Sequence, residues 1–168
     1  MHKEVLTFVK NILATLPPRK GVVDFGSRDV TNVSVRPLFE DAKVFIGVDI
    51  RAGKDVDVVA DAAKFKTDKR IDTVVSTSTL VHTKNMDAIL ANAYKVLSED
   101  GVAIISTVCA PWHPHGMDGG NVGDEFYRDV PADLLQKSLV EAGFASVKVE
   151  QTDAGDVFAI AWKAKRAK

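Results

Sequence analysis

The stretch ASVKVEQTDAGDVFAIAW, residues 145–162, contains two strand-like runs separated by a short turn. Two runs within it, 145–151 and 156–162, have the composition of β-strands. The connection between them, Thr152-Asp153-Ala154-Gly155, is typical of a turn. A connection this short cannot cross over a sheet, so the two runs are predicted to pair antiparallel. We therefore expect the sheet to end in a β-hairpin.

The segments before this hairpin alternate between apolar strands and helices. Five apolar runs are predicted as strands, namely 21–25, 44–48, 56–59, 71–75 and 102–107. Helical spacing of apolar residues predicts helices that end at Pro17-Pro18, at the turn Glu99-Asp100-Gly101 and at Gly143. This alternation indicates a parallel sheet covered on both faces. The expected fold class is α/β, a three-layer α/β/α sandwich whose seven-stranded, mostly parallel sheet ends in the antiparallel hairpin.

The composition is that of an ordinary globular protein. The chain has 168 residues, of which 46% are hydrophobic and 27% charged, and we expect residues 1–168 to form a single domain. The formal net charge of −1 argues against sequence-independent binding to nucleic acid, which depends on neutralising phosphates. The basic tail, residues 163–168, is expected to be solvated.

The cysteine content and the hydropathy indicate in which cellular compartment the protein is expected. Cys109 is the single cysteine, which excludes an intrachain disulfide and a cysteine cluster for zinc. No apolar stretch is long enough for a signal peptide or for a membrane span. We expect a cytoplasmic protein with no metal and no membrane partner, and the oligomeric state stays open.

Acidic residues follow three successive predicted strands. Asp24 lies in the first strand just before Gly26, Asp49 ends the second strand, and Asp61 follows the third. Ligands of open α/β sheets bind beyond the carboxyl ends of the strands. These three positions are therefore expected to meet at one ligand site.

Five segments of the chain form an ordered set: VDFGSRD at 23–29, IGVDI at 46–50, VADA at 59–62, DTVVS at 72–76 with LVH at 80–82, and YKVLSEDG at 94–101. Through these segments the chain resembles the class I S-adenosylmethionine-dependent methyltransferases over essentially its whole length. The last segment is similar to the "rvLkpGG" turn between helix and strand. The resemblance implies S-adenosylmethionine as the cofactor.

The resemblance also implies roles for individual residues. Asp24, Gly26 and Ser27 would form the turn beside the methionine portion of the cofactor, where glycine allows a close backbone approach. Asp49 would accept hydrogen bonds from the ribose hydroxyls, since a carboxylate offers acceptors only. Asp61 would recognise the adenine amino group and the Ala62 amide the adenine ring. Ser76 and His82 complete the expected cofactor-binding set.

Each of these positions has a simpler structural explanation that the sequence leaves open. Asp49 could only terminate a strand, because aspartate favours turns. Asp61 could only cap the segment that follows it. His82 could line the cofactor or acceptor cavity, or its ring could be satisfied by local backbone groups.

A long loop after the fifth strand carries the candidate catalytic residues. In residues 110–129, His113 and His115 are suited to act as a general base near neutral pH, whereas their spacing is weak evidence for a metal site. Tyr127 and Arg128 resemble part of an "H..P.D.yR" stretch in some methyltransferases and are expected to anchor the loop. The Trp112 to His115 end is expected to contact the substrate. The glycines in the loop favour a mobile cover over the acceptor.

The predicted function is methyl transfer to a small-molecule or sugar-like acceptor. The first turn contains only one glycine, and Arg28 stands where the resembling family commonly has its second. This departure supports an alternative, a non-catalytic methyltransferase-like binding or assembly module. A nucleotide-dependent oxidoreductase is disfavoured, because the G-x-G-x-x-G turn is absent and the terminal hairpin does not fit that fold.

Overall fold

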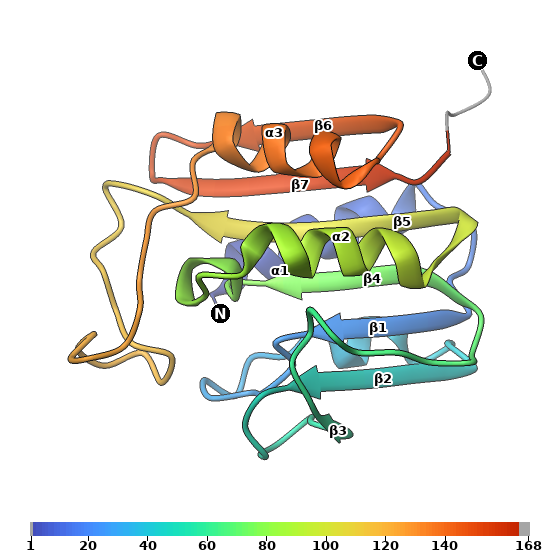
Figure 1. Cartoon of the computed structure of the whole chain (residues 1–168), viewed down its shortest axis with the longest axis horizontal. Helices are drawn as coiled ribbons and strands as arrows, with labels where there is room; N and C mark the ends of the chain where they lie inside the picture. The colour runs from blue at the N-terminus through green and yellow to red at the C-terminus, as the bar shows by residue number, and fades with distance from the viewer. Residues whose placement is uncertain (1, 165–168) are drawn as a thin grey trace.

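The computed structural model describes residues 2–164, and its centre is a seven-stranded sheet in the order β3-β2-β1-β4-β5-β7-β6 (Figure 1). The parallel neighbours are β1 (Gly21–Phe25), β2 (Val44–Asp49), β3 (Val58–Val59), β4 (Ile71–Thr77) and β5 (Leu97–Val108). The last two strands, β6 (Ser146–Gln151) and β7 (Asp156–Trp162), are antiparallel to each other, and β7 is antiparallel to β5. The predicted fold class and terminal hairpin are confirmed. Residues 165–168 of the basic tail lie outside the described residues.

The hairpin turn closes as its sequence indicates. The Thr152 amide donates to the Asp156 carbonyl at 2.9 Å, and the Thr152 hydroxyl accepts from the Asp156 amide at 3.1 Å. Gly155 has a φ of +89°, and a Cβ at this position would lie 2.3 Å from the Cys109 carbonyl oxygen. The turn therefore needs a glycine both for its backbone conformation and for its contact with the end of β5.

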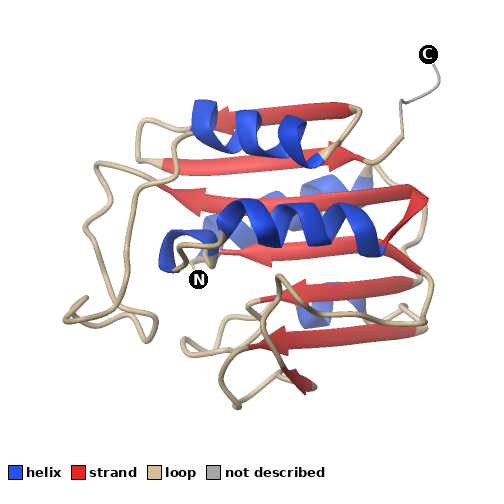
Figure 2. Ribbon diagram, viewed as in Figure 1, coloured by secondary structure: helices blue, strands red, loops and turns tan. Residues whose placement is uncertain are grey.

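Helices cover both faces of the sheet (Figure 2). One face carries α2 (Met86–Val96) and α3 (Ala132–Ala142), and the other carries α1 (Lys3–Ala14) and the short 3-10 helix η1 (Arg36–Phe39). Each face buries its own apolar cluster, the first including Leu90, Leu135 and Leu139 and the second including Val5 and Val9. The layers thus follow from the amphipathic spacing of the helices.

Three details differ from the expected elements. The third strand has only two residues, Val58 and Val59, and both are exposed. The helix α2 ends at Val96, and β5 begins at Leu97, which pairs with Ile71; the register then shifts, and Val102 pairs with Thr73. Gly101 therefore does not form the expected helix-ending turn. A Cβ there would lie 2.8 Å from the Leu97 side chain, so a tight contact within the strand explains the glycine.

The third predicted helix end is as expected. Gly143 follows α3 with a φ of +112°, and its amide donates to the Val140 carbonyl at 3.0 Å. A left-handed glycine is the usual way to end a helix, because it has no Cβ to clash in that conformation.

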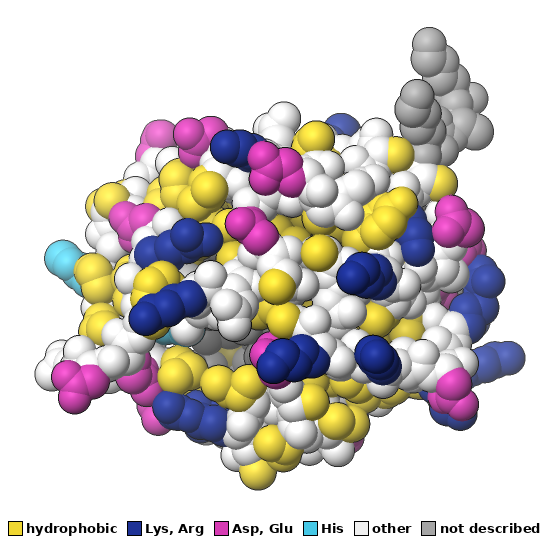
Figure 3. Space-filling view, in the orientation of Figure 1, with side chains coloured by type: hydrophobic (Ala, Val, Ile, Leu, Met, Phe, Trp, Pro, Cys, Tyr) yellow, Lys and Arg dark blue, Asp and Glu magenta, His cyan; other side chains and the backbone are white. Residues whose placement is uncertain are grey.

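The strand directions place a site at one edge of the molecule. The carboxyl ends of β1, β2, β4 and β5 point to the side from which the long loop after β5 extends (Figure 1). On the face viewed, basic and acidic side chains are interspersed rather than gathered by sign (Figure 3). No helix among residues 2–164 is long and apolar enough to cross a membrane.

Candidate active site

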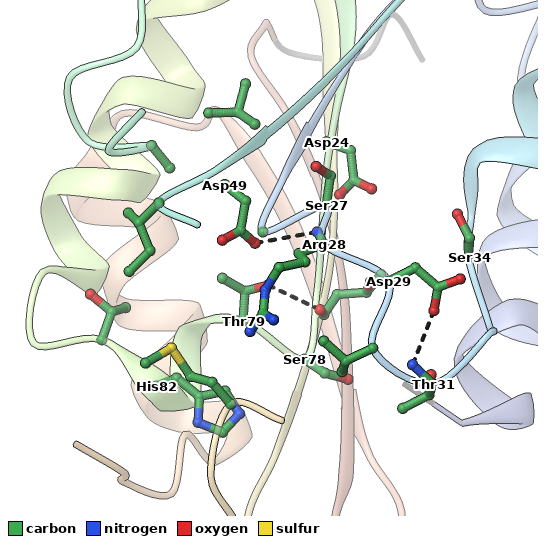
Figure 4. A pocket seen from close by; sticks show the side chains of 18 of the residues that line it. Asp24, Ser27, Arg28, Asp29, Thr31, Ser34, Asp49, Ser78, Thr79 and His82 are labelled. Carbon is green, nitrogen blue, oxygen red and sulfur yellow. Dashed lines mark hydrogen bonds between the residues drawn. The ribbon is translucent and has the colours of Figure 1, made fainter. Parts of the chain in front are cut away.

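A cavity of about 210 Å³ lies beyond the carboxyl ends of β1, β2 and β4 (Figure 4). Eight of the ten predicted site residues line it: Asp24, Gly26, Ser27, Asp49, Asp61, Ala62, His82 and His115. Two predicted residues, Ser76 and His113, do not. The cavity also takes side chains that were not in the predicted set, among them Ser78, Thr79 and Met117.

Gly26 turns the chain at the end of β1. Its φ is +84°, and its amide donates to the Val48 carbonyl of β2 at 2.8 Å. A Cβ at this position would lie 2.0 Å from the Thr79 hydroxyl oxygen. The protein's own packing therefore demands glycine here, since Thr79 from the segment after β4 lies directly over the turn.

Asp49 holds the next turn together and still faces the cavity. One carboxylate oxygen accepts from the Arg28 amide at 3.2 Å, and the other accepts from the Arg51 amide at 2.9 Å. A carboxylate has about four lone-pair sites, so both oxygens keep acceptor capacity toward a ligand. The structural and the binding explanation of Asp49 are thus compatible.

Asp61 likewise combines a turn with a place in the cavity wall. Its side chain accepts from the Ala63 amide at 2.9 Å, and its carbonyl oxygen accepts from the Lys64 and Phe65 amides. Within residues 2–164 the Ala62 amide makes no hydrogen bond, which leaves it as a donor for a ligand. The sequence left capping and binding open for Asp61, and the geometry allows both.

The floor of the cavity holds buried polar atoms without partners. One carboxylate oxygen of Asp24 and the Ser27 hydroxyl have no hydrogen-bond partner within the described chain. Burial raises the pKa of Asp24 to about 7, although Arg36 opposes the shift and the acids Asp55 and Asp49 add to it. Unsatisfied buried polar groups are rare in proteins and indicate a place where a ligand or water supplies the partner.

Ser76 lies one residue too early to reach the cavity. Its hydroxyl is buried and donates to the Phe25 carbonyl at 2.9 Å. The strand β4 continues to Thr77, so the residues at its carboxyl end are Thr77, Ser78 and Thr79. The apolar run in the sequence stops at Val75 and gave no signal for this extension.

Three aromatic rings meet at one end of the cavity. His82, in the short 3-10 helix η2 (Leu80–His82), lies 5.1 Å from the His115 ring and 5.7 Å from the Tyr127 ring, measured between centroids. His115 and Tyr127 are 5.2 Å apart. We call His82, His115 and Tyr127 the three-ring cluster. Burial, with a contribution from His115, lowers the pKa of His82 to about 4.

The first part of the long loop does not face the cavity as expected. Trp112 packs against the apolar core, and its ring lies tilted against that of His2, with ring centroids 4.8 Å apart. The His113 side chain is exposed, and its carbonyl oxygen lies 3.1 Å from Nδ1 of His115. Trp112 therefore anchors the loop, and only His115 of the Trp112 to His115 end lines the cavity.

Charged side chains tie the loop to the cavity rim. Arg28 pairs with Asp118 at 2.6 Å, and Arg51 pairs with Glu125 at 3.3 Å. Sequence reasoning missed these pairs, because nothing in the sequence relates the first turn to the distant loop. At the far end of the loop the Arg128 amide donates to the Val81 carbonyl at 2.9 Å, which agrees with the expected anchoring role. No group of three or more His, Cys, Asp or Glu side chains in residues 2–164 is arranged to hold a metal.

Two solved structures illustrate the similarity of fold. The 1,6-didemethyltoxoflavin-N1-methyltransferase of Burkholderia thailandensis, solved with 1,6-didemethyltoxoflavin and S-adenosylhomocysteine, superposes with a TM-score of 0.70 at 17% identity. The match covers 96% of this chain and 79% of that one. The phosphoethanolamine N-methyltransferase 2 of Haemonchus contortus gives a TM-score of 0.69 at 13% identity, and the match covers 96% of this chain but only 52% of that protein.

The family follows from a comparison with protein-family models. The model described as "Methyltransferase domain" matches residues 1–149, which is most of the chain. A search of curated proteins found no match. The resemblance in the sequence and its expected cofactor are confirmed at this level. The chain belongs to the methyltransferase-domain family of class I fold, whose methyl donor is S-adenosylmethionine.

Proposed function

We propose that this protein transfers a methyl group from S-adenosylmethionine to a small-molecule or sugar-like acceptor. One observation carries the proposal: Gly26, Asp49 and the Asp61-Ala62 pair, which lie at or just beyond the carboxyl ends of three different strands, line the same cavity. The resemblance assigns these positions to the three parts of the cofactor. Their meeting at the carboxyl ends of the strands is what such a ligand requires.

The groups in this cavity fit the cofactor. Asp49 has acceptor capacity left for the two ribose hydroxyls. The Ala62 amide and the second carboxylate oxygen of Asp61 are available to the edge of the adenine ring. The unpartnered oxygens of Asp24 and Ser27 lie beside the Gly26 turn, where the amino-acid portion would need polar partners.

The chemistry asks little more of the protein. The bound sulfonium supplies an activated methyl group, so the chain's task is to hold the acceptor in line with it and to exclude water. His115 is the histidine of the loop that reaches the cavity, and it is the candidate general base. His113 acts on it only through its backbone carbonyl.

A small acceptor fits the molecule better than a nucleic acid. The net charge is −1, and side chains of both charges are scattered over the face shown in Figure 3. A phosphate backbone needs a concentrated basic surface. The Burkholderia neighbour, which was solved with a small heterocycle, supports the same choice.

A non-catalytic binding or assembly module is the second candidate, and one observation favours it. Arg28 replaces a glycine of the resembling turn, and its guanidinium lies in the cavity wall, paired with Asp118. The Arg28 side chain occupies space that the glycine at this position in the resembling family leaves free for the cofactor.

Calorimetry separates the two candidates. We expect S-adenosylhomocysteine to bind the full chain with a micromolar dissociation constant, and we expect the radiolabelled methyl group of S-adenosylmethionine to reach an acceptor in a screen of hydroxyl and amine compounds. The absence of heat at about 1 mM S-adenosylhomocysteine, where a weak site still contributes about 4 kcal/mol, would contradict the proposal and favour the module.

A further inference from the structure

The three-ring cluster forms one end of the cavity. Two of its members, His82 and His115, line the cavity itself, and Tyr127 packs edge-on against both imidazoles at interplanar angles of 68° and 60°. The two imidazoles also meet edge-on, at 78°. These contacts restrict the rotation of each ring, so the cluster presents ring nitrogens in set directions.

The environment of His115 determines its tautomer. Its Nδ1 lies 3.1 Å from the His113 carbonyl oxygen. A carbonyl can only accept, so Nδ1 carries the hydrogen in this contact and the neutral ring has its lone pair on Nε2. His115 thus offers a proton acceptor whose opposite side is held by the backbone.

The other two rings are uncharged near neutral pH. Burial, together with the nearby His115, lowers the pKa of His82 to about 4, although Glu125 opposes the shift. Burial likewise raises the pKa of the Tyr127 hydroxyl. Nδ1 of His82 and the Tyr127 hydroxyl are buried and have no hydrogen-bond partner within residues 2–164. Because His82 lines the cavity, its Nδ1 is a polar group that a ligand could satisfy.

We propose that the three-ring cluster binds a neutral acceptor through a hydroxyl group and that His115 removes the proton of that hydroxyl. This inference rests on the proposed function and names the acceptor class. A hydroxyl group suits this site because it can both donate and accept hydrogen bonds. It can donate to the lone pair on Nε2 of His115 and accept from a second polar group.

Charged acceptors match the cluster less well. A carboxylate has acceptors only, so it would face the lone pair of His115. An ammonium group would bring a charge beside the buried rings of His82 and Tyr127, where burial is costly without a carboxylate partner. Glu125, the carboxylate that acts electrostatically on His82, is already bound to the Met117 amide and to Arg51.

The proposed step balances as a single substitution. The hydroxyl proton passes to Nε2 of His115, and a lone pair of the acceptor oxygen forms the new bond to the methyl carbon. The bond between that carbon and sulfur breaks, and its electron pair stays on sulfur, which becomes a neutral thioether. The imidazolium of His115 then returns its proton to solvent.

Nitrogen NMR of protein labelled with ¹⁵N in its histidines tests the inference. The full chain is saturated with S-adenosylhomocysteine at pH 7.5 and titrated with phenol, with benzoate and with benzylammonium, three probes that share a ring and differ in their polar group. We expect His115 to carry its hydrogen on Nδ1, and phenol to shift the signals of His115 and His82. Phenol should bind at least tenfold more tightly than either charged probe.

Two variants assign the effect. His115→Ala should weaken phenol binding at least tenfold and leave the affinity for S-adenosylhomocysteine unchanged within about twofold. His113→Ala is the matched control, because that side chain is exposed and contributes only its carbonyl, and phenol should bind it as it binds the wild type.

Each other outcome overturns the inference. If benzoate or benzylammonium binds as tightly as phenol or more tightly, the acceptor is not neutral. If Nε2 of His115 carries the hydrogen, His115 cannot accept the hydroxyl proton at that atom. If His115→Ala binds phenol as the wild type does, or if phenol shifts no histidine signal, the acceptor does not bind at the three-ring cluster. In these cases binding of S-adenosylhomocysteine leaves the proposed function standing, whereas its absence in calorimetry refutes the proposed function and this inference together.

Discussion

Gly26 shows how a single residue is constrained from within the protein. Its positive φ and the Thr79 side chain over it both exclude a Cβ. We expect Gly26→Val to lower the free energy of unfolding by about 2–4 kcal/mol, the range for strain combined with overpacking, and to abolish binding of S-adenosylhomocysteine. Urea denaturation and calorimetry measure the two effects.

A second substitution separates the clash from the backbone strain at Gly26. Thr79→Ala should relieve part of the stability loss of Gly26→Ala, because it removes the oxygen that a Cβ would approach to 2.0 Å. Strictly additive effects of the two changes would show that Thr79 is not the obstacle.

Asp49 is the residue whose substitution tests the cofactor site most directly. We expect Asp49→Ala to weaken binding of S-adenosylhomocysteine by about 1.5–3 kcal/mol, the usual contribution of hydrogen bonds to a charged group. The same substitution removes the contacts with the Arg28 and Arg51 amides, and this loss should lower the free energy of unfolding by about 1 kcal/mol.

The matched control for Asp49 is Asp68→Ala, an aspartate whose side chain is 88% exposed and lies outside the cavity wall. Unchanged affinity of Asp49→Ala in a folded protein would remove Asp49 from the site.

Asp24 makes stability depend on pH. Its pKa rises from 3.8 to about 7 in the folded state, chiefly because it is buried. Between these two values the folded protein holds a proton that the unfolded chain releases, so this contribution to stability is present at low pH and is lost as the pH rises through about 7. We expect Asp24→Asn to gain about 2–4 kcal/mol over the wild type between pH 5 and pH 8.

Urea unfolding of Asp24→Asn and wild type at the two pH values measures this gain. The two proteins share every other titrating group, so their difference isolates Asp24. A difference that does not change with pH would show that Asp24 is ionised in the folded protein at pH 5.

At the scale of elements, the loop 110–129 is held by ion pairs at the rim of the cavity. We predict that it exchanges amide hydrogens quickly in the free protein and slowly once S-adenosylhomocysteine fills the pocket. Arg51→Ala, which removes the pair with Glu125, should speed exchange in the loop by up to about fivefold, since exposed ion pairs contribute about 0–1 kcal/mol.

Arg70→Ala is the control for the loop, because it removes an exposed pair with Asp100, which lies near the start of β5, whereas the loop follows the end of that strand. Hydrogen exchange read by mass spectrometry follows each peptide. Equal protection of the loop with and without ligand would contradict the idea of a mobile cover.

At the scale of the whole molecule, the last strand is internal to the sheet. β7 pairs with both β5 and β6, and its residues Val157, Ala159 and Ala161 are almost fully buried. A chain that ends at Gln151 would leave the long edge of β5 unpaired and its apolar face open to water. We expect this truncated chain to lack cooperative unfolding and to aggregate.

The matched control keeps the whole chain and replaces Val140, which is exposed on α3, with Asp. This variant should unfold cooperatively within about 0.5 kcal/mol of the wild type. A truncated chain with a cooperative thermal transition would show that the hairpin is dispensable for the fold. Circular dichroism during heating distinguishes these outcomes.

The kind and order of the elements follow from the amino-acid sequence alone. Apolar periodicity specifies strands and helices locally, and a four-residue connection at 152–155 leaves no geometry but an antiparallel pair. The carboxyl ends of parallel strands meet at one edge, so Asp24, Asp49 and Asp61 could be assigned to one site before any coordinates were known. Each of these steps depends on neighbours in the chain or on a general rule of topology.

Which side chains meet depends on tertiary packing. Thr79 lies over Gly26, Arg28 reaches Asp118, and the loop brings His115 to His82. Ser76 and His113 lie near the site in sequence, yet the Ser76 hydroxyl binds within the sheet and the His113 side chain is exposed to solvent. Such contacts depend on where a strand ends and on the path of a loop, and both are set by packing among distant residues, which local periodicity does not record.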